Sequence, residues 1–365
     1  MKTLKLVVAA ASLALAAGAQ AQWKPSKPIS IIVPWAAGGA TDQVTRVAAG
    51  ELEEALGAKI VVINQPGGAG SIGTLNALKA PRDGYTWTAG APKQLGTYPV
   101  LGLADTRLDD FHIFISVTQV PIVSVNPDTP YQNMQQLLDA MKAKPGQITF
   151  ATAGNTSSGH IAAEAISKAT GLKYRHVTYD GGNPAVIATV GGESQVTTQL
   201  ASEQAEMIKG KRLRPLAVVS SRPLEIEGYG SIPPITNWVK RLPAVDTAFG
   251  IFIPKGAPAE VTAAVEKAWA GKIANSDKLK AYARARSVLF TPMSGKAAHD
   301  AVWATVITDA AIISEAGMAK VAPEKLGIPK PRFHDLRHTC AALMIDQGAH
   351  PKAIQERMRH SSIQV

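Results

Sequence analysis

Short apolar runs alternate along this chain with longer segments in which apolar residues recur every three or four positions. Continuous runs are typical of strands buried on both faces, and they predict strands at residues 29–34, 60–63, 85–88, 113–125 and 148–151. The helical spacing predicts helices that include residues 44–56, 75–78, 134–141 and 161–169. Gly57 and Gly171 mark two helix ends. This order of elements predicts an α/β fold with parallel sheets covered by helices on both faces.

Three loops between predicted strands and helices are the first candidates for a binding site. In such sheets, ligands bind at the carboxyl ends of the strands. The loops at residues 35–42, 153–160 and 179–184 combine glycine with small polar residues. Their backbone N–H groups and the positive ends of the following helices form an anion site that needs no Lys or Arg. Such residues also form ordinary turns and caps, but three such loops in one chain favour a site.

The candidate ligand contacts come from these loops. They are Ala37, Gly38, Gly39, Thr41 and Asp42 in the first loop, Asn155, Thr156, Ser157 and Ser158 in the second, and Asp180, Gly181 and Gly182 in the third. Thr41, Asp42 and Ser157 have two interpretations, because each is also suited to cap a helix. Valine at Gly39 or Gly182 is predicted to prevent ligand binding, because its side chain would keep ligand and backbone apart.

Five motifs in and around these loops point to a known family. They are PISIIVPWAAGG at 28–39, NQPGGAGSIG at 64–73, PRDGYT at 81–86, AGNTSSGH at 153–160 and HVTYDGGNPA at 176–185. In this order they resemble the Bug-type solute receptors of tripartite tricarboxylate transporters. The resemblance covers about residues 23–327.

The resemblance implies a two-lobed periplasmic-binding-protein (Venus-flytrap) fold with parallel-rich sheets. Residues 23–119 and 218–322 are expected to form one lobe and residues 120–217 the other. A receptor of this kind closes on a small carboxylate, holds it through loop amides and ordered water, and serves a membrane permease. We expect a monomer without a cofactor. Residues 201–204 and 245–250 depart from the family pattern and are expected near the cleft, so the identity of the carboxylate stays open.

The first residues predict export. Lys2 and Lys5 precede an apolar run at 6–17, and Ala19 and Ala21 have the small-x-small spacing of a cleavage site. The alternative is a membrane anchor, but the run is shorter than the roughly 18 residues that span a bilayer. Residues 1–21 are therefore interpreted as a signal peptide, and the localisation as periplasmic.

Composition separates the body of the chain from its end. Among 365 residues, 46% are apolar and 18% charged, which excludes disorder and coiled coil. The formal net charge of +10 at first suggests an anionic partner. The last 42 residues, however, hold seven Lys or Arg, half of the eight His and the single cysteine, Cys340. The body itself is only weakly charged.

The body of the chain contains no convincing catalytic or cofactor-binding motif. Residues 68–73 read G-x-G-x-x-G, but no acid follows at the end of the next strand, which argues against a dinucleotide. His112, His160, His176 and His299 lack paired spacing, so no metal site is predicted. The sequence also lacks a G-x-S-x-G elbow.

The end of the chain carries a different signature. RFHDLRHTCAA at 332–342 and IQERMRHSS at 354–362 resemble the catalytic domain of tyrosine recombinases, or phage integrases, over about residues 329–363. The resemblance implies that His334 assists proton transfer and that Arg337 and His360 hold the scissile phosphate. Arg grips a phosphate in two places, which suits that role.

This tail, residues 329–365, is interpreted as a short helical appendage left by a gene fusion or frameshift. No Tyr follows the second motif, and strand cleavage requires that nucleophile. We expect at most weak, nonspecific DNA binding through it. Three functions stay open: a carboxylate receptor, which the sequence favours, a DNA-recombination protein, and an exported α/β enzyme that acts on a small organic acid.

Overall fold

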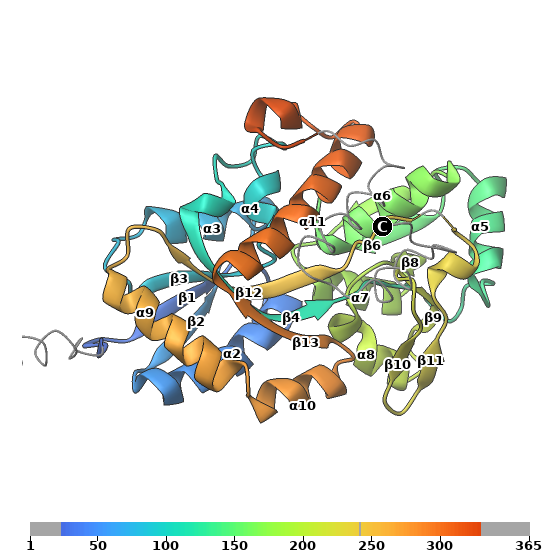
Figure 1. Cartoon of the computed structure of the whole chain (residues 1–365). Helices are drawn as coiled ribbons and strands as arrows, with labels where there is room; N and C mark the ends of the chain where they lie inside the picture. Colours follow the sequence, from blue (N-terminus) through green and yellow to red (C-terminus); the bar gives the residue numbers. More distant parts are fainter. Residues whose placement is uncertain (1–22, 241, 330–365) are drawn as a thin grey trace, which may run out of the picture.

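The computed structural model describes residues 23–240 and 242–329 (Figure 1). The predicted signal peptide and the tail residues His334, Arg337 and His360 lie outside the described residues. Within the described ranges the chain forms two large sheets, each with helices on both faces (Figure 1). No helix of the described part is long and apolar enough to cross a membrane.

The larger sheet has six strands in the order β13-β4-β12-β3-β1-β2. Its strands are β1 (Ile29–Val33), β2 (Ile60–Asn64), β3 (Thr86–Gly90), β4 (Phe111–Gln119), β12 (Thr247–Pro254) and β13 (Leu289–Ser294). On one face lie α2 (Ala40–Leu56), α9 (Ala259–Ala268) and α10 (Asp277–Ala285), and on the other α3 (Ser71–Lys79), α4 (Lys93–Thr97) and α11 (Gly295–Glu315) (Figure 1). The continuous apolar run in β1 is buried from both sides, as predicted.

The smaller sheet has five strands in the order β7-β6-β8-β5-β9. Its strands are β5 (Ile122–Val125), β6 (Thr149–Thr152), β7 (Arg175–Thr178), β8 (Val196–Thr197) and β9 (Arg214–Val218). The helices around it are α5 (Met134–Ala143), α6 (Ser158–Thr170), α7 (Gly182–Val190) and α8 (Ala201–Lys209). A short hairpin, β10 (Leu224–Ile226) with β11 (Gly230–Ile232), follows β9.

The prediction of one continuous strand at 113–125 is wrong. The chain leaves the larger sheet at the end of β4 and enters the smaller one with β5, and Pro121 lies between the two. Proline has no N–H to offer a sheet ladder, so this position suits a break. The chain returns to the larger sheet with β12. The segment 113–125 therefore holds two strands that belong to different sheets.

The sheets are mixed rather than purely parallel. β1 pairs in parallel with β2 and β3, and β6 pairs in parallel with β7 and β8, as the alternation of strands and helices predicts. The strands next to the two crossovers, β4, β5, β9 and β12, form antiparallel pairs. The chain enters the smaller sheet along β5 and leaves it along β9, and it leaves the larger sheet along β4 and returns along β12, so the two strands of each pair run in opposite directions.

A buried ion pair joins two helices on one face of the larger sheet. Lys93 on α4 lies with its Nζ 2.9 Å from Oδ2 of Asp309 on α11, and both side chains are almost fully buried. Burial raises the pKa of Asp309, and the Lys93 ammonium opposes that rise. The pair fixes α11 against the body of the protein.

Candidate binding site

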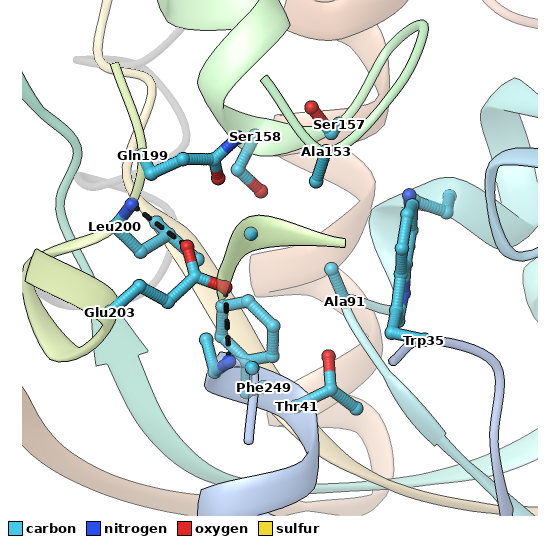
Figure 2. A pocket seen from close by; sticks show the side chains of 14 residues that line it. Trp35, Thr41, Ala91, Ala153, Ser157, Ser158, Gln199, Leu200, Glu203 and Phe249 are labelled. Atoms are coloured by element: carbon cyan, nitrogen blue, oxygen red, sulfur yellow. Dashed lines mark hydrogen bonds between the residues drawn. The ribbon is translucent and has the colours of Figure 1, made fainter. Parts of the chain in front are cut away.

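Two adjoining cavities lie between the loops of the two sheets. The inner one has a volume of about 30 Å³ and the outer one about 480 Å³, and Trp35 and Ala153 line both. The inner cavity is lined by Trp35, Gly39, Ala40, Thr41, Ala91, Gln94, Ala153, Ser157, Ser158, Gly182, Gln199, Leu200, Glu203 and Phe249 (Figure 2). These residues come from both sheets, so the cavity is a cleft between two halves of the molecule.

The three predicted loops meet at this cleft. Of the candidate residues, the inner cavity is lined by Gly39, Thr41, Ser157, Ser158 and Gly182, and the outer cavity by Asn155 and Asp180. The other five, Ala37, Gly38, Asp42, Thr156 and Gly181, line neither cavity. The first and third loops pack closely, because a methyl group on Gly181 would lie 2.9 Å from the Cβ of Ala36. The two halves therefore touch across the cleft.

The first loop shows that Thr41 and Asp42 are not helix caps. The N-cap of α2 is Gly39, and no side chain caps the helix there. Asp42 accepts hydrogen bonds from the Gly38 N–H at 2.9 Å, from Arg46 and from Asn64. Burial alone raises the pKa of Asp42, but these hydrogen bonds outweigh it and hold the pKa below its ordinary value. Asp42 thus braces the loop from outside the cleft, whereas Thr41 lines the inner cavity.

The second loop is held by a cap and by a histidine. Ser157 is the N-cap of α6, and its hydroxyl accepts a hydrogen bond from the His160 N–H. Nδ1 of His160 accepts the N–H of Thr156 at 2.9 Å, so the ring proton is on Nε2, which faces Glu164. His160 also stacks on His176 at 3.8 Å. Burial lowers the pKa of His176 to about 4. His160 is therefore a structural support of the loop.

Glu203 lines the cleft but is not among the residues predicted from the three loops. It lies on the first turn of α8 and is partly buried, and its Oε1 accepts the N–H of Ala40, the first residue of α2, at 3.0 Å. Its Oε2 accepts the N–H of Leu200 at 3.2 Å (Figure 2). With its amide group turned to satisfy both neighbours, Gln199 donates to the same Oε2 at 3.0 Å and accepts from the Ala153 N–H at 2.5 Å. One carboxylate thus joins helices from the two halves.

Two sequence signals were available for Glu203. It stands three residues after Leu200, and an acid at this place commonly turns back to the first backbone N–H of its helix. It also belongs to the segment 201–204 that departs from the family pattern. Phe249, in the other departing segment, lines the inner cavity as well, so the expectation that both segments lie near the cleft is confirmed.

The electrostatics of the cleft are unusual for an anion site. Neither cavity is lined by Lys or Arg, whereas Glu203 lines the inner cavity and Asp180 the outer one. Burial raises the pKa of Glu203 to about 7, against the opposing hydrogen bonds from Ala40 and Leu200. The described residues contain no cluster of His, Cys, Asp and Glu that would hold a metal ion. Positive potential in this cleft comes from backbone N–H groups and helix ends.

The titration of Glu203 predicts how stability depends on pH. Its pKa is about 7 in the folded chain against 4.5 ordinarily, so its contribution to the free energy of unfolding is full below about 4.5 and is lost as the pH rises through about 7. Glu203→Gln should therefore gain stability relative to the wild type between about pH 5 and about pH 8, by at most about 3 kcal/mol. Urea denaturation at both pH values measures the free energy of unfolding of the variant and of the wild type. Glu206→Gln, on the exposed side of the same helix, is the control, and equal pH dependence in all three proteins would contradict the prediction.

Comparison with known proteins places the chain in a family. A model of the tripartite tricarboxylate transporter receptor family matches residues 44–289, and a model of the phage integrase family matches residues 309–365. A UPF0065 protein from a tcbD–tcbE intergenic region of Pseudomonas sp. strain P51 is 32% identical over 245 residues, which are 65% of this chain and 71% of that protein. Protein BugT of Bordetella pertussis is 34% identical over 215 residues, 58% of this chain and 66% of BugT.

Solved structures have the same fold. R. palustris Rpa4515 with adipate superposes with a TM-score of 0.73 at 24% identity, over 81% of this chain and 99% of that one. The periplasmic binding protein BugD gives a TM-score of 0.72 at 23% identity with the same coverage. Together with the family match over residues 44–289, this confirms the two-sheet α/β fold predicted from the sequence. The chain belongs to the receptor family of the tripartite tricarboxylate transporters, whose members are solute-binding receptors and not enzymes.

Proposed function

We propose that the chain is a periplasmic receptor that captures a small carboxylate between its two halves and delivers it to the membrane permease of a tripartite transporter. On this proposal residues 1–21 are removed on export and the receptor acts as a monomer. The observation that carries the proposal is the cleft itself, where glycine-rich loops from both sheets and the start of α2 surround one cavity without a catalytic pair. Adipate in a protein of the same fold is consistent with this ligand class.

The two lobes of this receptor would follow the division of the chain between the sheets. Residues 23–119 with 218–322 would form one lobe, and residues 120–217 the other. The ligand contacts would be backbone N–H groups of the three loops, supported by the hydroxyl groups of Thr41, Ser157 and Ser158, which line the inner cavity. Asn155 and Asp180 would contact the part of the ligand that extends into the outer cavity.

Thr41→Val tests this assignment without a change of side-chain shape. The variant should bind a carboxylate found by thermal-shift screening about fivefold to tenfold more weakly, because one hydrogen bond contributes about 1 kcal/mol. Thr45→Val is the matched control, since Thr45 is buried in the same helix and lines neither cavity. Isothermal titration calorimetry gives both affinities. Equal weakening in the two variants would argue against a ligand contact by Thr41.

The phage integrase match suggests DNA recombination as a second candidate function. We propose that this chain does not carry it out. The described part of that match, residues 309–329, belongs to the receptor body. Asp309 pairs with Lys93, and Ile312, Ile313 and Ile328 are buried in the core of the protein. We propose that the tail beyond Pro329 is a vestige that contributes neither to ligand binding nor to DNA cleavage.

Truncation tests the role of the tail. A chain ending at Pro329 should keep the melting temperature and the carboxylate affinity of the full chain. A chain ending at Leu326 is the control, and it should lose about 2 kcal/mol of stability because it lacks Ile328, which is 3% exposed. Differential scanning calorimetry and titration calorimetry give the two quantities. Loss of affinity on removal of residues 330–365, or strand transfer by the full chain, would contradict the vestigial assignment.

A further inference from the structure

Glu203 occupies the place that the loop geometry offers to an anion. The first N–H groups of a helix have no partner within the helix, and they attract negative charge. At the start of α2 the Ala40 N–H is already bonded to Oε1 of Glu203, at 3.0 Å. The carboxylate of Glu203 thus already occupies this N–H group of the cleft.

The fit of this carboxylate is close. A methyl group on Gly182 would lie 1.9 Å from Oε1 and 2.3 Å from Oε2 of Glu203, so the side chain rests directly on the backbone of α7. The remaining inner cavity, about 30 Å³, has room for no more than about two water molecules. A ligand group that reaches this end of the cleft must therefore come within hydrogen-bond distance of Glu203.

The surroundings of Glu203 decide what that ligand group can be. Its neighbours are the N–H groups of Ala40 and Leu200 and the amide of Gln199, and no Lys or Arg lines either cavity. Once Glu203 is ionised, above a pH of about 7, a second carboxylate here would face a like charge with no Lys or Arg in the lining to compensate it, which is unfavourable. A hydrogen-bond donor would instead find an acceptor already in position.

We propose that Glu203 is the specificity-determining residue of the cleft, which excludes a second carboxylate from the inner end and selects monocarboxylates whose far end carries a hydrogen-bond donor. This rests on the proposed function, carboxylate capture. The ligand's own carboxylate then lies in the outer cavity, on the N–H groups of Gly154 and Asn155, two residues that line it. Its amide, hydroxyl or ammonium group points inward to Glu203.

Dicarboxylates and their monoamides provide an isosteric test. The probes are succinate, glutarate and adipate, each with its monoamide, titrated calorimetrically into the full-length chain at about pH 8.5, where Glu203 is ionised. The wild type should bind the monoamide of the best-fitting length at least about tenfold more tightly than the dicarboxylate. Glu203→Gln should reduce this ratio at least about fivefold, because it removes the charge and keeps the shape of the side chain.

Two further variants serve as controls. Glu206 lies on the same helix and pairs with Lys209 and Arg286 at the surface. Glu206→Gln should therefore leave the ratio of monoamide to dicarboxylate affinity unchanged. Glu203→Asp keeps the charge and should keep the preference for the monoamide, even if Glu203→Gln folds poorly. Circular dichroism verifies that each variant is folded.

The outcomes separate the two proposals. A wild type that binds the dicarboxylate as tightly as the monoamide, or a ratio that Glu203→Gln leaves unchanged, overturns the role of Glu203 and leaves carboxylate capture standing. If neither these six probes nor any other small carboxylate in a thermal-shift screen binds the folded proteins, carboxylate capture fails and the role of Glu203 fails with it.

Discussion

Gly182→Ala is expected to lower the free energy of unfolding by about 2 to 4 kcal/mol, although it adds only one methyl group. That methyl would overlap the carboxylate of Glu203, whose Oε1 would lie 1.9 Å from the new Cβ. A flexible glutamate at the surface would turn away. Glu203 is only partly exposed and is held at both carboxylate oxygens, so moving it breaks its hydrogen bonds to Ala40 and Leu200 and parts the two halves of the molecule. Urea denaturation measures the loss.

A double-mutant cycle shows whether Glu203 is the cause. In a Glu203→Ala background the overlap is absent, so Gly182→Ala should there cost less than about 1 kcal/mol. Gly39→Ala is the control among the loop glycines, because its Cβ would meet Ala36 O at 3.4 Å and Glu203 Oε1 at 3.5 Å, which are ordinary contacts. The sequence treats Gly39 and Gly182 as equivalent, whereas the structure makes Gly182 far more sensitive. A loss of the same size in both backgrounds would refute the contact.

Local patterns in the sequence were sufficient for much of the fold and for the location of the site. The run at 29–34 became β1, the helical spacing after it became α2, and Gly57 ends that helix in the left-handed conformation, with φ of +64°. The second and third loops lie together because they follow β6 and β7, which are parallel neighbours in the smaller sheet, whereas the first loop follows β1 in the larger sheet and meets them across the cleft. The strand, the helix and its end can be predicted from residues that are close together in the sequence.

Contacts between distant segments were not predictable in this way. Ala40 and Glu203 are separated by 163 residues, and no spacing rule relates a helix start to an acid so far away. Periodicity alone did not divide the segment 113–125 into β4 and β5, because it does not record which partner a strand pairs with; the boundary expected between residues 119 and 120 came from the family resemblance. The cap interpretation holds for Ser157, the N-cap of α6, but not for Thr41 and Asp42, since Gly39 is the N-cap of α2 without a side-chain hydrogen bond.

Asp309→Ala is expected to lower the free energy of unfolding by about 3 to 5 kcal/mol. The substitution leaves the ammonium of Lys93 buried without its counter-ion, 2% exposed and at the interface of α4 and α11. Removing one partner of a buried pair is costly because the remaining charge must be desolvated alone. Asp300→Ala, on the same helix but paired with Lys296 at the surface, should change stability by less than about 1 kcal/mol.

Lys93→Met with Asp309→Leu should recover most of the loss, because two apolar side chains need no counter-ion. Chemical denaturation of the four proteins measures the pair, and a single-variant loss below about 1 kcal/mol would show that the ion pair is not a structural link. The result also bears on the end of the chain. Asp309 is the first residue of the phage integrase match, yet it lies in a helix that packs on the receptor's larger sheet. If its removal destabilises the receptor as expected, any junction between the receptor and an integrase-like tail must lie after Asp309.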